Sequence, residues 1–374
     1  MKTGDREGRV LLRARMMGDD RAVKHGSMHS NIRRLFVASL VAFAALALDL
    51  AYIVGYRGTY FATHPRNPRL YRFEESVQRG GIYARGGEIL VESRPRGEKM
   101  ERRYSVPPSL SQTVGYSHRK YGKSGLEASY NRVLLGMSPA LRPMRPIYRE
   151  VFGRPKEGND IVLTIDLNLQ RLAESLLGLR RGAIVAVAPK TGEVLVLASN
   201  PGFDANSLEE EWPSLVQSPK SPFLNRAIQG LYPPGSAFKV VLASAALESM
   251  AAGPDTVFNC EGGIEVDGHW ISCPRPHGRI TFSEALAFSC NVAFIRMAFM
   301  VGKSNFTKFV EAYGLQAEMP FELAVKSGSF PRPEDLNGSL MAESAIGQGS
   351  TLVTPLHMAM VASTIANGGI MMRP

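Results

Sequence analysis

Apolar and polar residues are distributed along the chain in three ways, and each predicts a different part of the protein. Residues 35–56 form an apolar run of 22 residues in which Asp49 carries the one charge. Such a run would span about 33 Å as a helix, which is enough to cross a bilayer. Residues 57–155 contain only short apolar pieces, whereas residues 156–374 contain longer segments with helix and strand periodicity. We therefore expect an anchor, a small module and a larger C-terminal domain.

The charges that precede the apolar run predict its orientation. Nine Lys or Arg residues lie before it, against four Asp or Glu residues. The positive-inside rule then places residues 1–32 in the cytoplasm as a basic tail, makes residues 33–56 a single transmembrane anchor in the cytoplasmic membrane, and puts the rest of the chain outside. A cleaved signal peptide is the alternative, because residues 45–47 (ALA) resemble a cleavage site. The apolar run continues to Val54, which favours the uncleaved anchor.

Residues 57–155 are predicted to form a small extracytoplasmic pedestal or dimerisation-type module with irregular β-structure. The segment is rich in Arg, Pro, Gly and Tyr, and its strand-like pieces at residues 81–83 and 88–91 are short. It shows no pattern for a long amphipathic helix.

The remaining segment, residues 156–374, begins with the patterns of a mixed α/β (α+β) domain. A strand-like run at residues 160–166 leads into a helical pattern at residues 167–177. Apolar runs at residues 183–188 and 193–198 then flank a Pro-Lys-Thr-Gly turn, which predicts a β-hairpin buried on at least one face.

Ser236 and Lys239 are the first candidates for catalytic chemistry. Pro-Pro-Gly precedes Ser236 and an apolar helical pattern follows it, so Ser236 is expected at a helix N-terminus. It could cap that helix, or it could be a nucleophile whose oxyanion the helix dipole stabilises. Lys239 lies one turn later and is the only charge before Glu248. We expect its amine to be buried, which lowers the pKa of a lysine and makes it a candidate general base.

A second polar pair, Ser289 and Asn291, interrupts an apolar run. Polar side chains in such a run need partners, which a cap, the core or an active site can supply. Neither the Ser-x-x-Lys nor the Ser-x-Asn pattern is specific alone, because each occurs once more in the pedestal, beginning at Ser117 and at Ser129. Those copies lie in a Tyr-, Gly- and Arg-rich stretch without a buried helix, so the later copies are the stronger candidates.

The order of these two patterns is that of serine acyl-transferring penicillin-binding proteins and class A β-lactamases. From Arg79 onward, over about 300 residues, the chain resembles a class B penicillin-binding protein, a peptidoglycan D,D-transpeptidase. The matching segments are RGGIYARGGEIL at residues 79–90, YGKSGLE at 121–127, KTGE at 190–193, YPPGSAFK at 232–239, HG at 277–278 with SCN at 289–291, and AIGQG at 345–349 with TPL at 354–356. Ala84 stands where the family usually has an acidic residue.

The resemblance implies a DD-peptidase/β-lactamase-like fold, in which a five-stranded antiparallel sheet is combined with a helical subdomain. It also implies a transpeptidase that acts on stem peptides ending in D-Ala-D-Ala and is acylated by β-lactams. By the same resemblance Ser236 attacks the penultimate carbonyl, and Lys239 accepts the proton. Ser289 relays a proton to the leaving D-Ala, and Asn291 holds the peptide backbone. The N–H of Ser236 can form half of an oxyanion hole.

The third element of the family signature, Lys-Thr/Ser-Gly on a strand after the TPL segment, is not found. Look-alikes begin at Lys123, Lys190 and Lys326. The first two precede Ser236 and are expected to be structural. Lys326 follows the SCN segment but precedes GQG, and nearby prolines would interrupt a strand. We therefore expect this chain to be an incomplete catalytic domain that does not turn over, with coding sequence continuing after Pro374.

One further group could be a metal site or a redox site. Four candidate ligands lie within eighteen residues, namely Cys260, His269, Cys273 and His277. A predicted hairpin that turns at residues 267–268 would bring Cys260 near Cys273. A disulfide, free thiols and a zinc site all stay open, although the spacing matches no standard zinc finger. His277 is expected to be a turn residue and Cys290 a packing residue.

Composition and charge narrow the range of partners. The net charge is +10, but Lys and Arg are spread over the whole chain, so no nucleic-acid surface is expected. Without an HExxH or CxxC motif, no metal and no cofactor are expected at the catalytic centre. The expected partners are the stem peptide, β-lactams, the membrane and a membrane glycan polymerase of the SEDS type. A β-lactam sensor or β-lactamase-like protein, and a non-catalytic cell-wall scaffold, are the alternatives.

Overall fold

The computed structural model describes residues 28–58, 60, 74, 77–97, 99–137 and 157–374. The chain forms two units, Met1–Asn67 and Pro68–Pro374. Most of the predicted basic tail, up to residue 27, lies outside the described residues.

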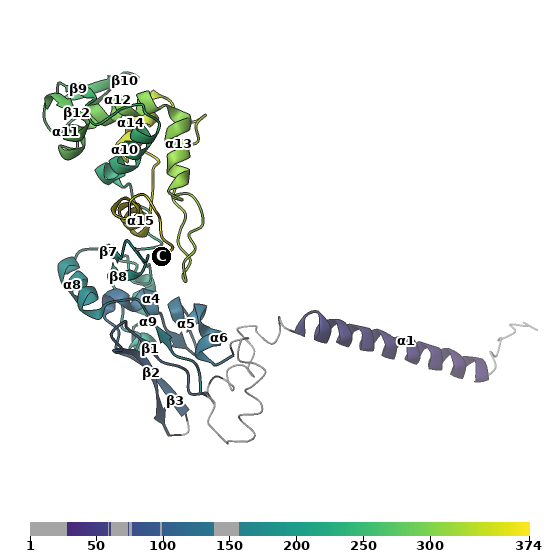
Figure 1. Ribbon diagram of the computed structural model, residues 1–374. Coiled ribbons are helices and arrows are strands. Elements are labelled where there is room, and N and C mark those ends of the chain that lie inside the picture. The colour runs from purple at the N-terminus through teal and green to yellow at the C-terminus, as the bar shows by residue number, and fades with distance from the viewer. Residues whose placement is uncertain (1–27, 59, 61–73, 75–76, 98, 138–156) are drawn as a thin grey trace, which may run out of the picture. The chain divides into compact units, whose positions relative to one another are not determined.

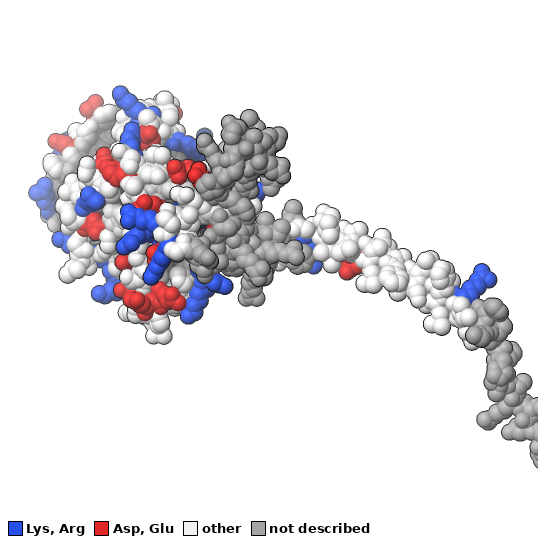
Figure 2. All heavy atoms as spheres, turned by 90° about the horizontal axis from the view of Figure 1, so that it is seen from below, with Lys and Arg blue, Asp and Glu red and all other residues white. Residues whose placement is uncertain are grey.

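The first unit contains the long helix α1 (Met28–Gly55), coloured purple in Figure 1. Its segment Ser30–Gly55 is long and apolar enough to cross a membrane, and none of its most apolar stretch is buried against protein. Figure 2 shows that few charged side chains lie along this helix. The predicted apolar helix is therefore confirmed, and it starts earlier than residue 33 because the polar residues before the apolar run are also helical.

The second unit opens with a four-stranded sheet. Its strands are β1 (Ile82–Tyr83), β2 (Ile89–Arg96), β3 (Lys99–Tyr104) and β6 (Ile161–Val162), in the order β3-β2-β1-β6. β1 pairs antiparallel with β2 and parallel with β6. The predicted strands at residues 81–83 and 88–91 are confirmed, and the strand-like run at residues 160–166 supplies β6, which joins this sheet.

Short elements make up the rest of the described pedestal. They are η1 (Pro108–Leu110), α4 (Ser111–Val114), β4 (Ser117–His118), β5 (Gly122–Lys123), α5 (Gly125–Ser129) and α6 (Asn131–Leu134). This agrees with the absence of a long amphipathic pattern in the sequence.

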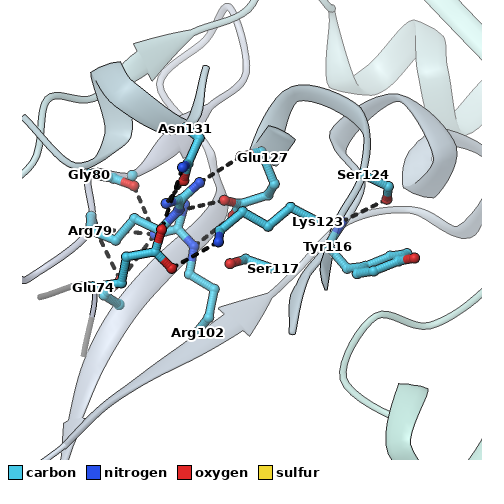
Figure 3. Close-up of polar contacts among 12 residues, drawn as sticks. Glu74, Arg79, Gly80, Arg102, Tyr116, Ser117, Lys123, Ser124, Glu127 and Asn131 are labelled. Carbon is cyan, nitrogen blue, oxygen red and sulfur yellow. Dashed lines mark hydrogen bonds and ion pairs between the residues drawn. The ribbon is translucent and has the colours of Figure 1, made fainter. Parts of the chain in front are cut away.

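A buried carboxylate joins these elements (Figure 3). Glu127 on α5 is fully buried, and its side chain accepts hydrogen bonds from Arg79 Nε at 2.6 Å and Arg102 Nε at 2.7 Å. Arg79 also donates to the Glu127 carbonyl at 2.7 Å and to Asn131 Oδ1 at 2.6 Å. Arg79 precedes β1 and Arg102 lies on β3, so one carboxylate ties the sheet to the short helices.

The C-terminal part begins with one helix and one hairpin that pack together. The elements are α8 (Leu167–Leu177), β7 (Gly182–Val187) and β8 (Val194–Asn200), and α15 (Pro355–Ala366) packs against β7. Asp166 caps α8, because its Oδ1 accepts from the N–H groups of Asn168 and Leu169 at 2.9 and 3.0 Å. The predicted helix and hairpin are confirmed. Among the described residues, the sheet of the C-terminal part consists of β7 and β8, which pair antiparallel.

A largely helical part carries the remaining elements. Its helices are α10 (Lys239–Glu248), α11 (Phe282–Ala287), α12 (Asn291–Val301), α13 (Lys303–Ala312) and α14 (Gly338–Ala345), and α9 (Leu208–Gln217) lies earlier in the chain. Its strand pairs are β9 (Val257–Cys260) with β12 (Gly278–Thr281) and β10 (Gly263–Val266) with β11 (His269–Ser272). α12 packs against α10, α13 and α14 as well as β9, β10 and β11 (Figure 1). The predicted turn at residues 267–268 is confirmed between β10 and β11, with φ of 49° and 76°.

The buried ion network makes the pedestal sensitive to one substitution. Glu127→Ala would leave two guanidinium groups, 8% and 9% exposed, without their carboxylate. Removing one partner of a buried ion pair typically costs about 3–5 kcal/mol. We expect the melting temperature of the purified protein, followed by circular dichroism, to fall by several degrees.

Glu101→Ala is the matched control, because it breaks the Arg96–Glu101 pair, whose side chains are 78% and 44% exposed. An exposed pair contributes about 0–1 kcal/mol. Equal melting temperatures for the two variants would contradict the role of Glu127.

Candidate active site

Ser236 lies in a 3-10 turn, η3 (Gly235–Phe238), that runs directly into helix α10. Its side chain is exposed, and neither of these two described elements has a side-chain cap. The alternative that Ser236 caps the helix is therefore wrong. Ser236 lies inside the 3-10 turn, and the N-cap position of α10 falls two residues later, on Phe238. Gly235 has a φ of 58°, a left-handed conformation that favours glycine immediately before the serine.

Lys239 is the first residue of α10 and is only 1% exposed. Its Nζ donates to the Ser289 carbonyl at 2.7 Å, to Ser289 Oγ at 3.0 Å and to Asn291 Oδ1 at 2.7 Å. The ring of Phe294 lies 5.4 Å from the same nitrogen. The predicted burial of the amine is confirmed, and three of the four residues proposed for the site meet at one atom.

Burial changes the acid–base chemistry of this amine. Desolvation lowers the pKa of Lys239 from 10.5 to about 8, although the Cys273 and Cys290 thiols act in the opposite direction. A lysine with such a pKa is partly neutral near physiological pH, so it can accept a proton.

Ser236 and Lys239 lie three residues apart in one helical turn and therefore share a face. Among the described residues no hydrogen bond joins Ser236 Oγ to Lys239 Nζ, because the amine donates to Ser289 and Asn291. A neutral amine has only two N–H donors. Deprotonation thus releases one of the three bonds and provides a lone pair that can accept the proton of Ser236.

The turn that supplies Ser289 and Asn291 connects α11 to α12. Ser289 has a φ of 54°, which is unusual for a residue other than glycine. Cys290 is the N-cap of α12, and its Sγ accepts from the Ala293 N–H at 3.5 Å. Asn291 Nδ2 donates to the Ser272 carbonyl at 2.9 Å, which fixes the orientation of the amide. One of the two Nδ2 protons stays available for a ligand.

The GQG segment supports the turn that carries Ser236 from the other side. The N–H of Gly235 donates to the Gly347 carbonyl at 2.9 Å, and Tyr232 and Val353 exchange backbone hydrogen bonds at 2.9 and 3.0 Å. Gly347 has a φ of 68°, and a Cβ atom there would collide with the Gly235 carbonyl oxygen. Sequence reasoning assigned this segment to the family but missed that it determines the position of Ser236.

The three look-alikes of the family's basic strand lie elsewhere. Lys190 occupies the turn between β7 and β8, and Lys123 on β5 is ion-paired with Glu74 at 2.8 Å. The N–H of Lys326 donates to the Ile228 carbonyl at 2.8 Å. Within the described part of the chain, no hydrogen bond links Lys326 to Lys239, Ser289 or Asn291.

The structure changes the membership of the cysteine–histidine group. The ligand atoms of Cys260, Cys273, His277 and Cys290 all lie within 4.8 Å of one another, whereas His269 is exposed and its Nδ1 contacts the Asp267 carbonyl at 3.0 Å. The inclusion of His269 is therefore wrong, whereas Cys290 joins the cluster and is also, as predicted, buried in the core. All three cysteines are free thiols in the structure. Equal intervals of thirteen residues, from Cys260 to Cys273 and from His277 to Cys290, were a signal available in the sequence.

Comparison with known families gives two matches that follow one another along the chain. Residues 79–161 match the penicillin binding protein A dimerisation domain, and residues 182–374 match the penicillin binding protein transpeptidase domain.

Curated and solved relatives agree with these matches. The chain is 31% identical to the peptidoglycan D,D-transpeptidase PbpA of Mycolicibacterium smegmatis, over 93% of this chain and 74% of that protein. It is 32% identical to the D,D-transpeptidase MrdA of Acinetobacter baumannii, over 66% of this chain and 40% of that protein. The structure of penicillin-binding protein A from M. tuberculosis as a ceftriaxone acyl-enzyme is similar with a TM-score of 0.75 and 30% identity, over 82% of this chain and 72% of that one.

The contact between Gly347 and the turn that carries Ser236 predicts a stability effect. Gly347→Ala would place a Cβ atom against the Gly235 carbonyl and would force alanine into a left-handed conformation. The conformation costs about 1–2 kcal/mol, and overpacking typically adds about 1–3 kcal/mol. We expect a melting temperature lower by several degrees, measured by differential scanning fluorimetry.

Gly253→Ala is the control, because a Cβ atom at Gly253 would meet no atom within 4 Å. If both variants melted with the wild type, the proposed close approach at Gly347 would be disproved.

Proposed function

The chain belongs to the class B penicillin-binding proteins, which are peptidoglycan D,D-transpeptidases, and from this premise we propose that Ser236 is its acylated nucleophile. The protein would cross-link stem peptides that end in D-Ala-D-Ala, and β-lactams would acylate the same serine. The observation that carries the proposal is the buried Lys239 amine, held by Ser289 and Asn291 one helical turn from Ser236.

In the acylation step Ser236 Oγ attacks the carbonyl carbon of the penultimate D-Ala, and neutral Lys239 accepts the hydroxyl proton. The tetrahedral oxyanion receives a hydrogen bond from the Ser236 N–H, a type of stabilisation whose loss typically costs about 10²–10³ in rate. The C–N bond to the terminal D-Ala then breaks, and its amine takes up a proton that Lys239 returns through Ser289 Oγ. An ester on Ser236 remains.

In the second step the amine of another stem peptide attacks this ester. Ser289 Oγ and Lys239 take the proton of the attacking amine, and Lys239 returns a proton to Ser236 Oγ as the C–O bond breaks. The 3.0 Å contact between Lys239 Nζ and Ser289 Oγ supports such a relay in both directions. The free Nδ2 proton of Asn291 is suited to hold the substrate backbone.

Helix α1 supports the proposal of a single-pass anchor in the cytoplasmic membrane with the catalytic domain outside. Its length and its unburied apolar surface fit a lipid environment, and the charge bias before it favours a cytoplasmic N-terminus. We further propose that the pedestal between anchor and catalytic domain contacts a membrane glycan polymerase of the SEDS type, which would supply the strands to be cross-linked.

The nucleophile assignment predicts the result of labelling the full-length protein with fluorescent penicillin. Label should map to the peptide that contains Ser236 and should be lost in Ser236→Ala. Lys239→Ala should slow acylation by about 10²–10⁴-fold, because a positioned general base contributes that much. Peptide mass mapping after stopped time points measures both results.

The second Ser-x-x-Lys copy provides the control variants. Ser117→Ala and Lys120→Ala should label at the wild-type rate. Label that persists in Ser236→Ala, or that maps to Ser117, would refute the assignment.

The pKa of Lys239 predicts a pH profile for acylation. Burial lowers the pKa of this amine to about 8, and only the neutral form is a base. The acylation rate should therefore rise about tenfold per pH unit below pH 8 and level off above it. Stopped-flow measurement with a chromogenic cephalosporin tests this, with melting temperatures recorded over the same range. A rate that keeps rising to pH 10 would show that Lys239 has an ordinary pKa.

A further inference from the structure

A polar groove of about 950 Å³ opens in the pedestal, next to the buried ion network. Its walls come from β2, β3, the segment around β4 and residues between 205 and 209, where α9 begins. Five arginines line the groove, against two carboxylates, Glu101 and Glu209. The arginines are Arg94, Arg96, Arg102, Arg103 and Arg119. Such an excess of cationic side chains favours an anionic ligand.

The ion network beside the groove has one positive charge more than it has carboxylates. Glu127 is a single anion, and it accepts hydrogen bonds from the guanidinium groups of both Arg79 and Arg102. Arg102 Nη1 donates to uncharged acceptors, which are the carbonyls of Arg79 and Gly80 and the Ser93 hydroxyl. Figure 3 shows the two guanidinium groups around the single carboxylate.

One nitrogen of the Arg102 guanidinium also lacks an acceptor. The Arg102 side chain is 9% exposed, and its Nη2 is buried without a hydrogen-bond partner among the described residues. Buried donors in native proteins are nearly always bonded, and leaving a charged one unpaired is costly. An anion bound in the groove, which Arg102 lines, would supply the missing negative charge beside this guanidinium.

Arg103 is the groove arginine whose charge is most clearly available to a ligand. Arg94 and Arg96 pair with carboxylates of the β2–β3 hairpin, at 2.6 and 2.8 Å. Arg103 on β3 is exposed, and its side chain makes no ion pair or hydrogen bond within the part of the chain that the structure describes. Its guanidinium group is therefore a free donor on the groove wall.

His118 supplies a second donor. Its Nδ1 accepts from the backbone N–H groups of Lys120 and Tyr121 at 3.2 and 3.4 Å, so Nε2 carries a proton and can donate. The His118 ring stacks on Tyr121, with ring centroids 4.7 Å apart, and Tyr121 stacks on Trp212 at 3.9 Å. These contacts fix the orientation of the imidazole.

The placement of these donors favours phosphate over carboxylate. A carboxylate is planar and is satisfied by one guanidinium fork, whereas a phosphate group presents oxygens in several directions. Arg103 lies on β3 and His118 on β4, so they can bind different oxygens of one group. The groove is larger than a single phosphate group requires, which suits a ligand in which the phosphate belongs to a larger molecule.

We propose that this groove binds a phosphate-bearing anion, with Arg103 and His118 as donors and Arg102 as an uncompensated charge in its wall. Soluble phosphate polymers and the headgroups of anionic lipids both present such oxygens. The groove does not include Ser236 or Lys239, so it is a second site in addition to the proposed catalytic centre.

Isothermal titration calorimetry of the full chain in an uncharged detergent tests the groove, with sodium tripolyphosphate as the probe. We expect saturable binding that weakens as salt is raised, because the contacts are ionic. Arg103→Ala should bind at least about tenfold more weakly, since it loses a hydrogen bond between charged groups. Arg171→Ala is the matched control, because it removes an exposed arginine on α8, outside the groove, and it should bind as the wild type does.

The two sources of phosphate are distinguished in the same detergent solution. Dioctanoyl phosphatidylglycerol, a short-chain anionic lipid, is compared with dioctanoyl phosphatidylcholine, whose headgroup has no net charge. Binding of phosphatidylglycerol that is tighter than that of tripolyphosphate, and that weakens in Arg103→Ala, would assign a lipid headgroup. Binding of tripolyphosphate alone would assign a soluble phosphate polymer.

Three results would overturn the proposal. The first is that wild-type protein binds neither tripolyphosphate nor phosphatidylglycerol at concentrations up to about 10 mM. The second is equal affinity of the wild type and Arg103→Ala, with equal melting temperatures showing that both are folded. The third is equally tight binding of citrate, which would show that the groove selects negative charge and not phosphate. None of these measurements uses acylation, so a failure of the groove and a failure of the Ser236 assignment are distinguishable.

Discussion

The candidate catalytic centre depends on keeping a lysine amine inside an apolar helix. Lys239 is the only charged residue of α10 before Glu248, and burial removes the water that would solvate it. An unpartnered buried cation would cost several kcal/mol, so the amine requires acceptors from the surrounding protein. Ser289 and Asn291 supply them from positions 50 and 52 residues away. One nitrogen therefore links the start of α10 to the turn before α12 and to the first residue of α12. The lowered pKa of that nitrogen results from the same burial.

The pedestal also contains a buried charge that needs partners from distant segments, but here the buried group is an anion and its partners are cations. Glu127 is a buried anion whose two guanidinium partners precede β1 and lie on β3. In both cases a buried ionisable group cannot be satisfied by its own helix, so it specifies which distant segments must come together. This explains why the motif segments at residues 79–90 and 121–127 are linked in space.

Local structure was predictable from local chemistry. Asp166 before an apolar-periodic run set the start of α8, and Asp267-Gly268 set the turn between β10 and β11. Features decided by long-range packing were not predictable in this way. The parallel pairing of β6 with β1 joins residues 79 positions apart, and no local pattern records it. The 3-10 turn at Ser236 likewise depends on the hydrogen bond from Gly235 to Gly347.

In the candidate site, too, some features were predictable from the local sequence and others depended on long-range packing. Lys239, Ser289 and Asn291 were found because polar residues in apolar runs stand out, and the structure brings them together. His269 was grouped with the cysteines because it lies within the same eighteen residues, and Cys290 was assigned to packing because it lies between Ser289 and Asn291 in an apolar run. Closeness in sequence therefore did not predict which residues belong to the cysteine–histidine cluster. The cluster forms where two strand ends and the start of α12 meet, which only the tertiary structure decides.

The conformation of Ser289 shows why this turn needs support from two directions. A left-handed φ costs a residue other than glycine about 1–3 kcal/mol, and glycine at position 289 would remove that strain. Glycine would also remove the hydroxyl that contacts Lys239 Nζ at 3.0 Å. A serine at this position is therefore stable only if other interactions outweigh the strain. The hydrogen bonds from Lys239 act on one side of the turn, and the cysteine–histidine cluster around Cys290 acts on the other. The backbone strain at position 289 thus arises because the site needs the serine hydroxyl where the left-handed backbone conformation alone would favour glycine.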